Sequence, residues 1–209
     1  MWLTVFSDAS WDSKYGAAGF GAWAMREDWE QGRFMSGPLN QVLLSSTEAE
    51  LCGIAKALHS LPEGSFDGIT HLSLQCDAVG ALGMIYYRLI GRVQLSHVKG
   101  EKDVPILRNG NDPTMLQKKA LDIIRKTVPL DVPIFLRHIK GHGKKSGSGG
   151  RTWVNNQCDK LAKNHMRERR AILEANPLSP IFPGSNKERT NGSTKDDQLH
   201  SPAWDEGAD

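Results

Sequence analysis

The feature that most limits how this chain can fold is a change in the spacing of its apolar residues near residue 45. Before that point, apolar residues alternate with others or form short runs bounded by glycine, as they do in β-strands. After it, they recur at helical spacing in some stretches and at every second position in others. This pattern predicts a meander of strands followed by helices and strands in alternation.

Three strands are expected in the first 40 residues. The first begins at residue 2, alternates its apolar residues between two faces, and ends at Asp8. After a turn-rich patch, Gly16–Gly21, the second strand spans Phe20–Met25. The third spans Gly32–Leu39 and is ended by its glycine-proline pair. Tight turns between such strands predict an antiparallel arrangement.

A helix is expected over 46–60, where Leu51, Ile54 and Leu58 lie on one apolar face. Its start has the pattern of a capping box, in which a serine hydroxyl and the Glu48 side chain bond each other's free amides. The other expected elements are a strand at 69–76, a helix capped by Asp77 and running to about 90, a helix at 114–127, a strand at 132–139 and a helix at 155–175.

The element order predicts an α/β fold with a five-stranded mixed sheet flanked by helices. Residues 91–112 have weak periodicity and are expected to form an insertion or long loop, and 141–150 a glycine-rich flexible loop. We expect one folded domain over 1–175. From 176 the composition turns to proline, glycine, serine and mixed charge, which is typical of a disordered tail over 176–209.

The composition is that of an ordinary globular protein, with 39% hydrophobic and 24% charged residues. No apolar run approaches the roughly 20 residues of a membrane helix, and the first residues do not resemble a signal peptide. Cys52, Cys76 and Cys158 have no metal-ligand spacing. We therefore expect free, buried thiols in a reducing compartment, a cytoplasmic location and no contact with membrane.

Charge is divided unevenly along the chain. Residues 1–87 contain 4 Lys and Arg against 10 Asp and Glu, whereas residues 88–175 contain 19 against 8. Basic clustering of this kind is typical of a surface that binds nucleic acid, although a solvated basic surface explains it equally well.

Four acids lie near expected element ends: Asp8 and Asp77 close strands, Glu50 is in the first turn of a helix, and Asp159 opens the last helix. Ligands collect at the carboxyl ends of parallel strands, so Asp8 and Asp77 would converge if their strands are parallel neighbours. Carboxylate oxygens select hard cations such as Mg²⁺ or Mn²⁺. The alternative for Asp77 and Asp159 is stabilisation of a helix N-terminus, about 1 kcal/mol each.

Glu48 and Glu50 compete for one place in such a site, because they lie about 200° apart around a helix. Glu48 already has the capping box, whereas Glu50 lies at the edge of the core face. We favour Glu50.

Five motifs together, in this order along the chain, resemble type-1 ribonuclease H over about residues 1–170. They are Phe-Ser-Asp8-Ala-Ser, Thr-Glu-Ala-Glu50-Leu, Leu-Gln-Cys-Asp77, Lys140-Gly-His142-Gly and Asn155-Asn-Gln-Cys-Asp159-Lys-Leu-Ala. The run around Glu50 also resembles the ribonuclease H domains of retroelements. Because the first strand begins at residue 2, we expect a stand-alone domain.

The resemblance implies a ribonuclease H-like fold and hydrolysis of the RNA strand of an RNA–DNA hybrid, leaving 5′-phosphate and 3′-hydroxyl ends. It implies the use of two Mg²⁺ ions, with Mn²⁺ able to substitute. A monomer is the default expectation. The resemblance also assigns roles to residues: metal binding to Asp8, Glu50, Asp77 and Asp159, proton transfer or product release to His142, and substrate contact to Ser45, Ser46 and Asn155.

Two other functions stay open from the sequence. The same fold hosts nucleases that cut DNA or single-stranded RNA. A catalytically inactive hybrid-binding module is the other alternative, and the complete set of four acids disfavours it.

Overall fold

The computed structural model describes residues 1–89, 91–95, 112–139 and 150–176. Within these ranges the chain forms strands first and then alternates helices with strands. In chain order the elements are β1 (Trp2–Asp12), β2 (Ala17–Arg26), β3 (Arg33–Leu39), α1 (Ser46–His59), β4 (His71–Cys76), α2 (Val79–Arg88), β5 (Val93–Leu95), α3 (Met115–Thr127), β6 (Ile134–His138) and α4 (Gly150–Ala175).

The strands form one mixed sheet in the order β3-β2-β1-β4-β6-β5. The first three strands are antiparallel, and β1, β4, β6 and β5 are parallel neighbours. The predicted α/β class with a mixed sheet is therefore confirmed. The predicted number of five strands is wrong, because β5 forms within 91–112. Its three residues are too few to show a strand period, and its pairing with β6 is what makes it a strand.

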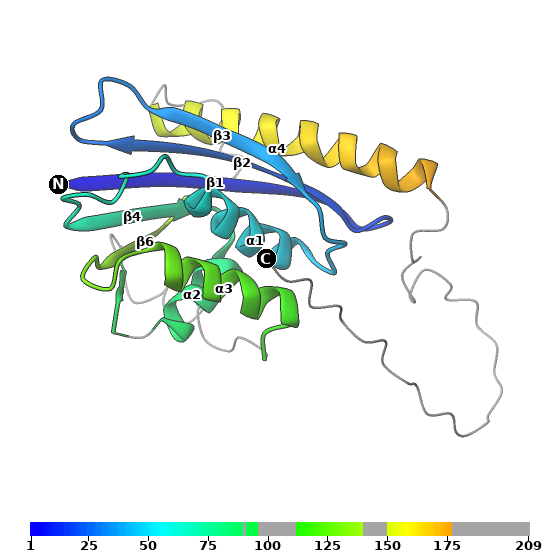
Figure 1. Cartoon of the computed structure of the whole chain (residues 1–209). Coiled ribbons are helices and arrows are strands. Elements are labelled where there is room, and N and C mark those ends of the chain that lie inside the picture. Colours follow the sequence, from blue (N-terminus) through cyan, green and yellow to red (C-terminus); the bar gives the residue numbers. More distant parts are fainter. Residues whose placement is uncertain (90, 96–111, 140–149, 177–209) are drawn as a thin grey trace, which may run out of the picture.

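The helices cover both faces of the sheet (Figure 1). Helix α1 packs on one face, where residues such as Leu3, Val5 and Ile54 form the main core. Helix α4 lies on the other face over β1, β2 and β3, and Phe6, Val154 and Cys158 form a smaller core beneath it. None of the described helices combines the length and the apolar character needed to cross a membrane.

Several predicted boundaries are wrong, and two of them concern the proposed site. Strand β1 runs four residues beyond Asp8, because it stays paired with β2 as far as Asp12. Helix α4 begins at Gly150, so Asp159 lies well inside it. The N-cap of α2 is Ala78, and no side chain caps this helix, so Asp77 is not a cap.

The glycines between β1 and β3 have other roles than the expected ones. Of the predicted turn-rich patch, Gly16 has a left-handed backbone with φ of 63°, but Gly19 and Gly21 lie inside β2. Gly37 and Pro38 do not end β3; they lie within it. Proline is tolerated there because β3 is an edge strand.

Gly19 and Gly21 allow α4 to lie directly on the backbone of β2. A Cβ atom on Gly21 would lie 2.1 Å from the carbonyl oxygen of Cys158, and one on Gly19 would lie 2.5 Å from the amide nitrogen of Met166. Gly21 is also the partner of Asp8 in the β1–β2 register. The approach of α4 to the sheet is thus closest beside a proposed site residue.

The predicted tail lies outside the described residues beyond 176, and the predicted loop at 141–150 lies outside them except for its last residue. The division into a domain over 1–175 and a tail stays a prediction.

We expect Gly21→Ala to destabilise the protein by about 2 kcal/mol, because its methyl group meets backbone atoms that cannot turn aside. Gly37→Ala is the matched control, since its methyl group would meet only the ring of Phe20, at 3.3 Å. Urea denaturation of both variants measures the effect. Equal stability of the two variants would show that α4 does not depend on this contact.

Candidate metal centre

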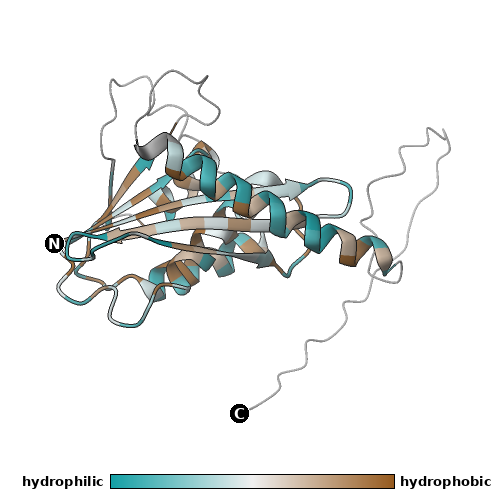
Figure 2. Cartoon of the chain, turned by 90° about the horizontal axis from the view of Figure 1, so that it is seen from above, coloured by the Kyte–Doolittle hydropathy of each residue, from teal (hydrophilic) through white to brown (hydrophobic). Residues whose placement is uncertain are grey.

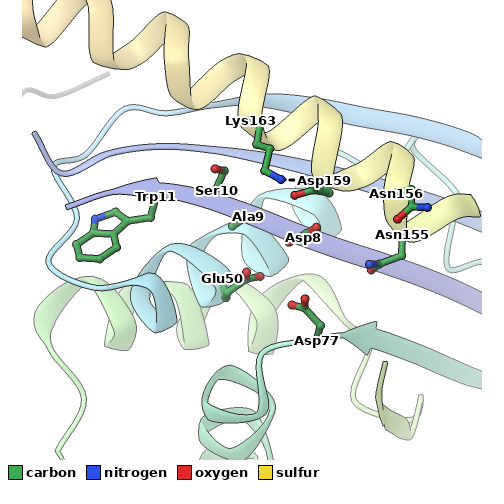
Figure 3. Close-up of a pocket in the computed structure, with 10 residues that line it drawn as sticks. All are labelled: Asp8, Ala9, Ser10, Trp11, Glu50, Asp77, Asn155, Asn156, Asp159 and Lys163. Atoms are coloured by element: carbon green, nitrogen blue, oxygen red, sulfur yellow. Dashed lines mark hydrogen bonds and ion pairs between the residues drawn. The ribbon is translucent and has the colours of Figure 1, made fainter. Parts of the chain in front are cut away.

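The four predicted acids, Asp8, Glu50, Asp77 and Asp159, line one cavity of about 260 Å³ (Figure 3). They come from four separate elements or element ends. The other residues that line the cavity are Ala9, Ser10, Trp11, Asn155, Asn156 and Lys163.

The cavity exists because two neighbouring parallel strands differ in length. The β1–β4 ladder ends with the pair Phe6 and Gln75, and β4 ends at Cys76, whereas β1 continues. Past this point β1 has no strand beside it on that edge. Asp8 lies on the continuing strand, and Asp77 follows the last residue of β4 (Figure 3).

Glu50 and Asp159 reach the cavity from opposite faces of the sheet. Glu50 lies in the second turn of α1, not in the first as expected, and its carboxylate lies near Asp8 and Asp77 (Figure 3). Asp159 reaches the cavity from α4, which lies on the other face of the sheet. On α4, Asn155 precedes Asp159 by four residues and Lys163 follows it by four, so the three share one side of the helix. Lys163 Nζ lies 2.8 Å from Asp159 Oδ2.

Two of the acids are strongly affected by burial and by each other. Burial, followed by repulsion from Asp77 and Asp159, raises the pKa of Asp8 from 3.8 to about 7. Burial, followed by repulsion from Asp8 and Asp77, raises the pKa of Glu50 from 4.5 to about 9. A hydrogen bond from the Ala9 amide opposes both increases. Without a cation, the cavity disfavours full ionisation of its acids.

Cys76 adds a sulfur atom beside the carboxylates, and its ligand atom lies within 4.8 Å of those of Glu50 and Asp77. Its Sγ donates to Glu50 Oε2 at 3.7 Å and accepts from the Ala78 amide at 3.2 Å. Burial raises the pKa of this thiol well above its ordinary 9.0. Cys76 therefore stays protonated, and the available donors are carboxylate oxygens, which suit Mg²⁺ or Mn²⁺.

Glu48 points away from the cavity. It is fully buried; its Oε2 accepts from the Leu44 amide at 2.7 Å, and its Oε1 accepts from the Thr114 hydroxyl. The Ser45 hydroxyl accepts from the Glu48 amide at 3.2 Å as expected. The carboxylate of Glu48, however, binds the amide of Leu44 and not that of Ser45, so the predicted capping box is only half formed.

The predicted substrate residues are placed differently from one another. Asn155 lines the cavity. Ser45 is the N-cap of α1, and Ser46 is exposed one helical turn before Glu50. His142 lies outside the described residues. The roles of all four stay predictions.

Sequence reasoning missed several residues around the cavity. Lys163 could have been found, because it follows Asp159 by four positions in an expected helix. Ser10 and Trp11 could not, because β1 was expected to end at Asp8. His138 was also missed; its Nε2 lies 3.0 Å from the Asp77 carbonyl oxygen and thereby links the end of β6 to the site.

No protein-family model and no curated protein matches this sequence. Among solved structures, ribonuclease H1 of the archaeon Halobacterium salinarum is similar over 80% of this chain and 99% of its own, with 15% identity and a TM-score of 0.49. The N-terminal ribonuclease H domain of a Mycobacterium tuberculosis protein is similar over 82% and 97%, with 15% identity and a TM-score of 0.48. LC11-RNase H1, solved in complex with an RNA/DNA hybrid, is similar over 79% and 97%, with 15% identity and a TM-score of 0.46. All three are named as ribonuclease H proteins or domains.

Asp8→Asn should stabilise the metal-free protein, and increasingly so as pH rises. Because the pKa of Asp8 is higher in the folded state than its ordinary 3.8, the contribution of Asp8 to stability is most favourable below about pH 4 and is lost as pH rises through about 7. The full difference corresponds to roughly 4 kcal/mol, an upper limit for the gain. Thermal denaturation in a chelator between about pH 4 and pH 8 measures it. Asp122→Asn, at a position of α3 where the side chain is 46% exposed, is the control, and equal pH dependence in all three proteins would contradict the prediction.

Glu48→Ala and Glu50→Ala should differ in their effects on stability. Glu48→Ala should cost about 2–3 kcal/mol, because it leaves the Leu44 amide without its acceptor. Glu50→Ala should cost no stability in the metal-free protein at neutral pH, since it removes a repelled, buried acid. Added Mg²⁺ should then raise the melting temperature of the wild type and of Glu48→Ala but not of Glu50→Ala. A Mg²⁺ response that survives in Glu50→Ala would exclude Glu50 as a ligand.

Proposed function

We propose that this protein is a metal-dependent endonuclease that hydrolyses the RNA strand of RNA–DNA hybrids and leaves 5′-phosphate and 3′-hydroxyl ends. The observation that carries the proposal is the convergence of Asp8, Glu50, Asp77 and Asp159 on one cavity from separate parts of the chain. The motifs around these residues, which resemble type-1 ribonuclease H, supply the substrate class.

The chemistry of the cavity supports the proposal that it binds divalent cations. Its donors are oxygen atoms, and the raised pKa values of Asp8 and Glu50 indicate an excess of negative charge that cations would offset. We propose that the four acids hold two Mg²⁺ ions, which Mn²⁺ can replace. When bound, two such ions supply activation of the attacking water and stabilisation of the leaving oxygen.

Residues other than the four acids would position the substrate, assist the reaction or limit repulsion among the acids. Asn155 presents an amide beside Asp159 and can donate to a phosphate oxygen. Lys163 pairs with Asp159 and lowers the pKa of Asp8, so it limits repulsion among the acids before substrate and metal arrive. His142 is proposed to assist proton transfer or product release, and Ser45 and Ser46 to contact the substrate backbone.

Hybrid recognition would rest on phosphate contacts and on 2′-hydroxyl groups in a wide, shallow minor groove. We therefore expect little sequence preference and weaker binding at higher salt. We propose that the domain over 1–175 acts as a monomer in the cytoplasm.

Asp77→Asn should lower cleavage of a labelled hybrid by at least about a thousandfold, because it removes a ligand while keeping the shape of the side chain. Folding and hybrid binding should change little. The assay compares RNA–DNA hybrid, duplex DNA and single-stranded RNA, each with Mg²⁺ or a chelator, and the ends of the products are mapped.

Asp122→Asn, which removes an exposed acid on α3, is the control and should keep wild-type activity. Full activity of Asp77→Asn would end the assignment of this residue. Faster cleavage of DNA or single-stranded RNA than of hybrid would replace the substrate class, and absence of Mg²⁺-dependent turnover on any substrate would favour a binding module.

A further inference from the structure

The cavity is acidic, yet α4, which forms one wall of the cavity, has basic residues on its solvent-exposed side. Figure 2 shows hydrophilic residues along the exposed side of α4. Lys160, Lys163 and Arg167 of α4 are defined here as the α4 ridge. Lys163 belongs to the lining of the cavity, whereas Lys160 and Arg167 are exposed and lie outside it.

Helix geometry places the ridge next to the cavity. Asn156 lines the cavity. At about 100° per residue, Lys160 lies about 40° from Asn156 around the helix axis, and Arg167 about 20° from it. Both cations therefore follow the same side of α4 as Asn156 and extend it along the helix.

Two of the ridge cations, Lys160 and Arg167, differ from other basic residues of α4 in having no partner among the described residues. Arg169 donates to the Asn40 carbonyl oxygen at 2.8 Å, and Arg170 lies 3.5 Å from Asp12 Oδ2. By contrast, Lys160 and Arg167 make no ion pair or hydrogen bond with the part of the chain that the structure describes. Two solvated cations beside an acidic cavity are available to an anion that the cavity alone would repel.

The length of the ridge suits a phosphate backbone. Lys160 and Arg167 are seven residues apart, about 10 Å along a helix that rises 1.5 Å per residue. A nucleic-acid strand rises about 3.4 Å per nucleotide along the duplex axis, so a helix parallel to that axis would pass about three phosphates over this length. Lys163, which contacts a proposed metal ligand, lies within this span.

We propose that the α4 ridge binds the phosphates that flank the scissile position, and so lays one strand of the duplex along α4. The proposal rests on the proposed function for the identity of the duplex, and it adds a phosphate-binding surface outside the cavity. It assigns Lys160 and Arg167 to binding of the substrate and not to the hydrolytic step.

The test is a double variant, Lys160→Gln with Arg167→Gln, made alone and in the non-cleaving Asp77→Asn background. Fluorescence anisotropy measures binding of hybrid, duplex DNA and duplex RNA over a range of salt concentrations. We expect hybrid binding to weaken by about tenfold at roughly 0.1 M salt, and the slope of log affinity against log salt to fall by about 2, near 0.9 per lost contact. In the cleaving background, KM should rise while kcat stays unchanged.

Lys56→Gln with Lys118→Gln is the matched control. It removes the same charge from exposed positions of α1 and α3, which do not lie on the face that α4 covers (Figure 1). Its affinity and salt slope should stay close to those of the starting protein.

The proposal is refuted if the ridge double variant keeps the affinity and the salt slope of the starting protein. It is also refuted if the control variant loses as much affinity as the ridge variant, or if none of the three duplexes binds. Failure of the proposed function gives a different result. In that case the wild type does not cleave hybrid, while the loss of duplex binding in the ridge variant still supports the surface.

Discussion

The contact on which the site depends is the backbone-to-backbone approach of α4 to β2 at Gly19 and Gly21. A side chain on Gly21 would collide with the carbonyl oxygen of Cys158, the residue that precedes Asp159. Gly21 also faces Asp8 across the β1–β2 ladder. Because Gly21 has no Cβ, α4 can lie close to the sheet at this point. This is where two proposed ligands from different elements, Asp8 of β1 and Asp159 of α4, must come together. Helix α4 is held further along by Arg169 and by the contact of Tyr15 with Glu174.

The same geometry makes the site costly for the metal-free protein. Asp8 and Glu50 are buried, and burial is the largest cause of their raised pKa values. A pocket of this kind loses stability as its acids ionise, so the surrounding fold must be stable enough to hold it together. The core beneath α1 serves this purpose, together with the buried Glu48, which joins the start of α1 to Thr114 at the start of α3. Two glutamates that lie two residues apart therefore affect stability in different ways. Glu48 stabilises the fold, whereas burial of Glu50, a proposed metal ligand, beside other acids destabilises the metal-free protein.

Much of this arrangement could be predicted from the sequence, and the misses have a common cause. The helical period separated Glu48 from Glu50. The sequence analysis expected Asp8 and Asp77 to converge if their strands were parallel neighbours, and the β1–β4 pairing meets this condition. The errors arose where contacts between elements that are distant in sequence, and not the local pattern, determine the secondary structure. Continued pairing with β2 carries β1 past Asp8, pairing with β6 turns Val93–Leu95 into a strand, and packing against α4 explains glycines that local rules assign to a turn.

The charge layout follows from these packing constraints as well. An acidic cavity needs opposite charge nearby, but a cation inside it would compete with metal for the carboxylates. The chain places a single lysine, Lys163, among the residues that line the cavity, and there it pairs with Asp159, the acid that descends from α4. Lys160 and Arg167 stay outside on the same helix, so they can attract a polyanion without neutralising the acids. One helix thereby carries a proposed metal ligand, Asp159, its counter-charge, Lys163, and the two exposed cations of the proposed phosphate-binding surface. Asp159 and Lys163 lie on the side of α4 that borders the cavity, whereas Lys160 lies about 100° from Asp159 around the helix axis.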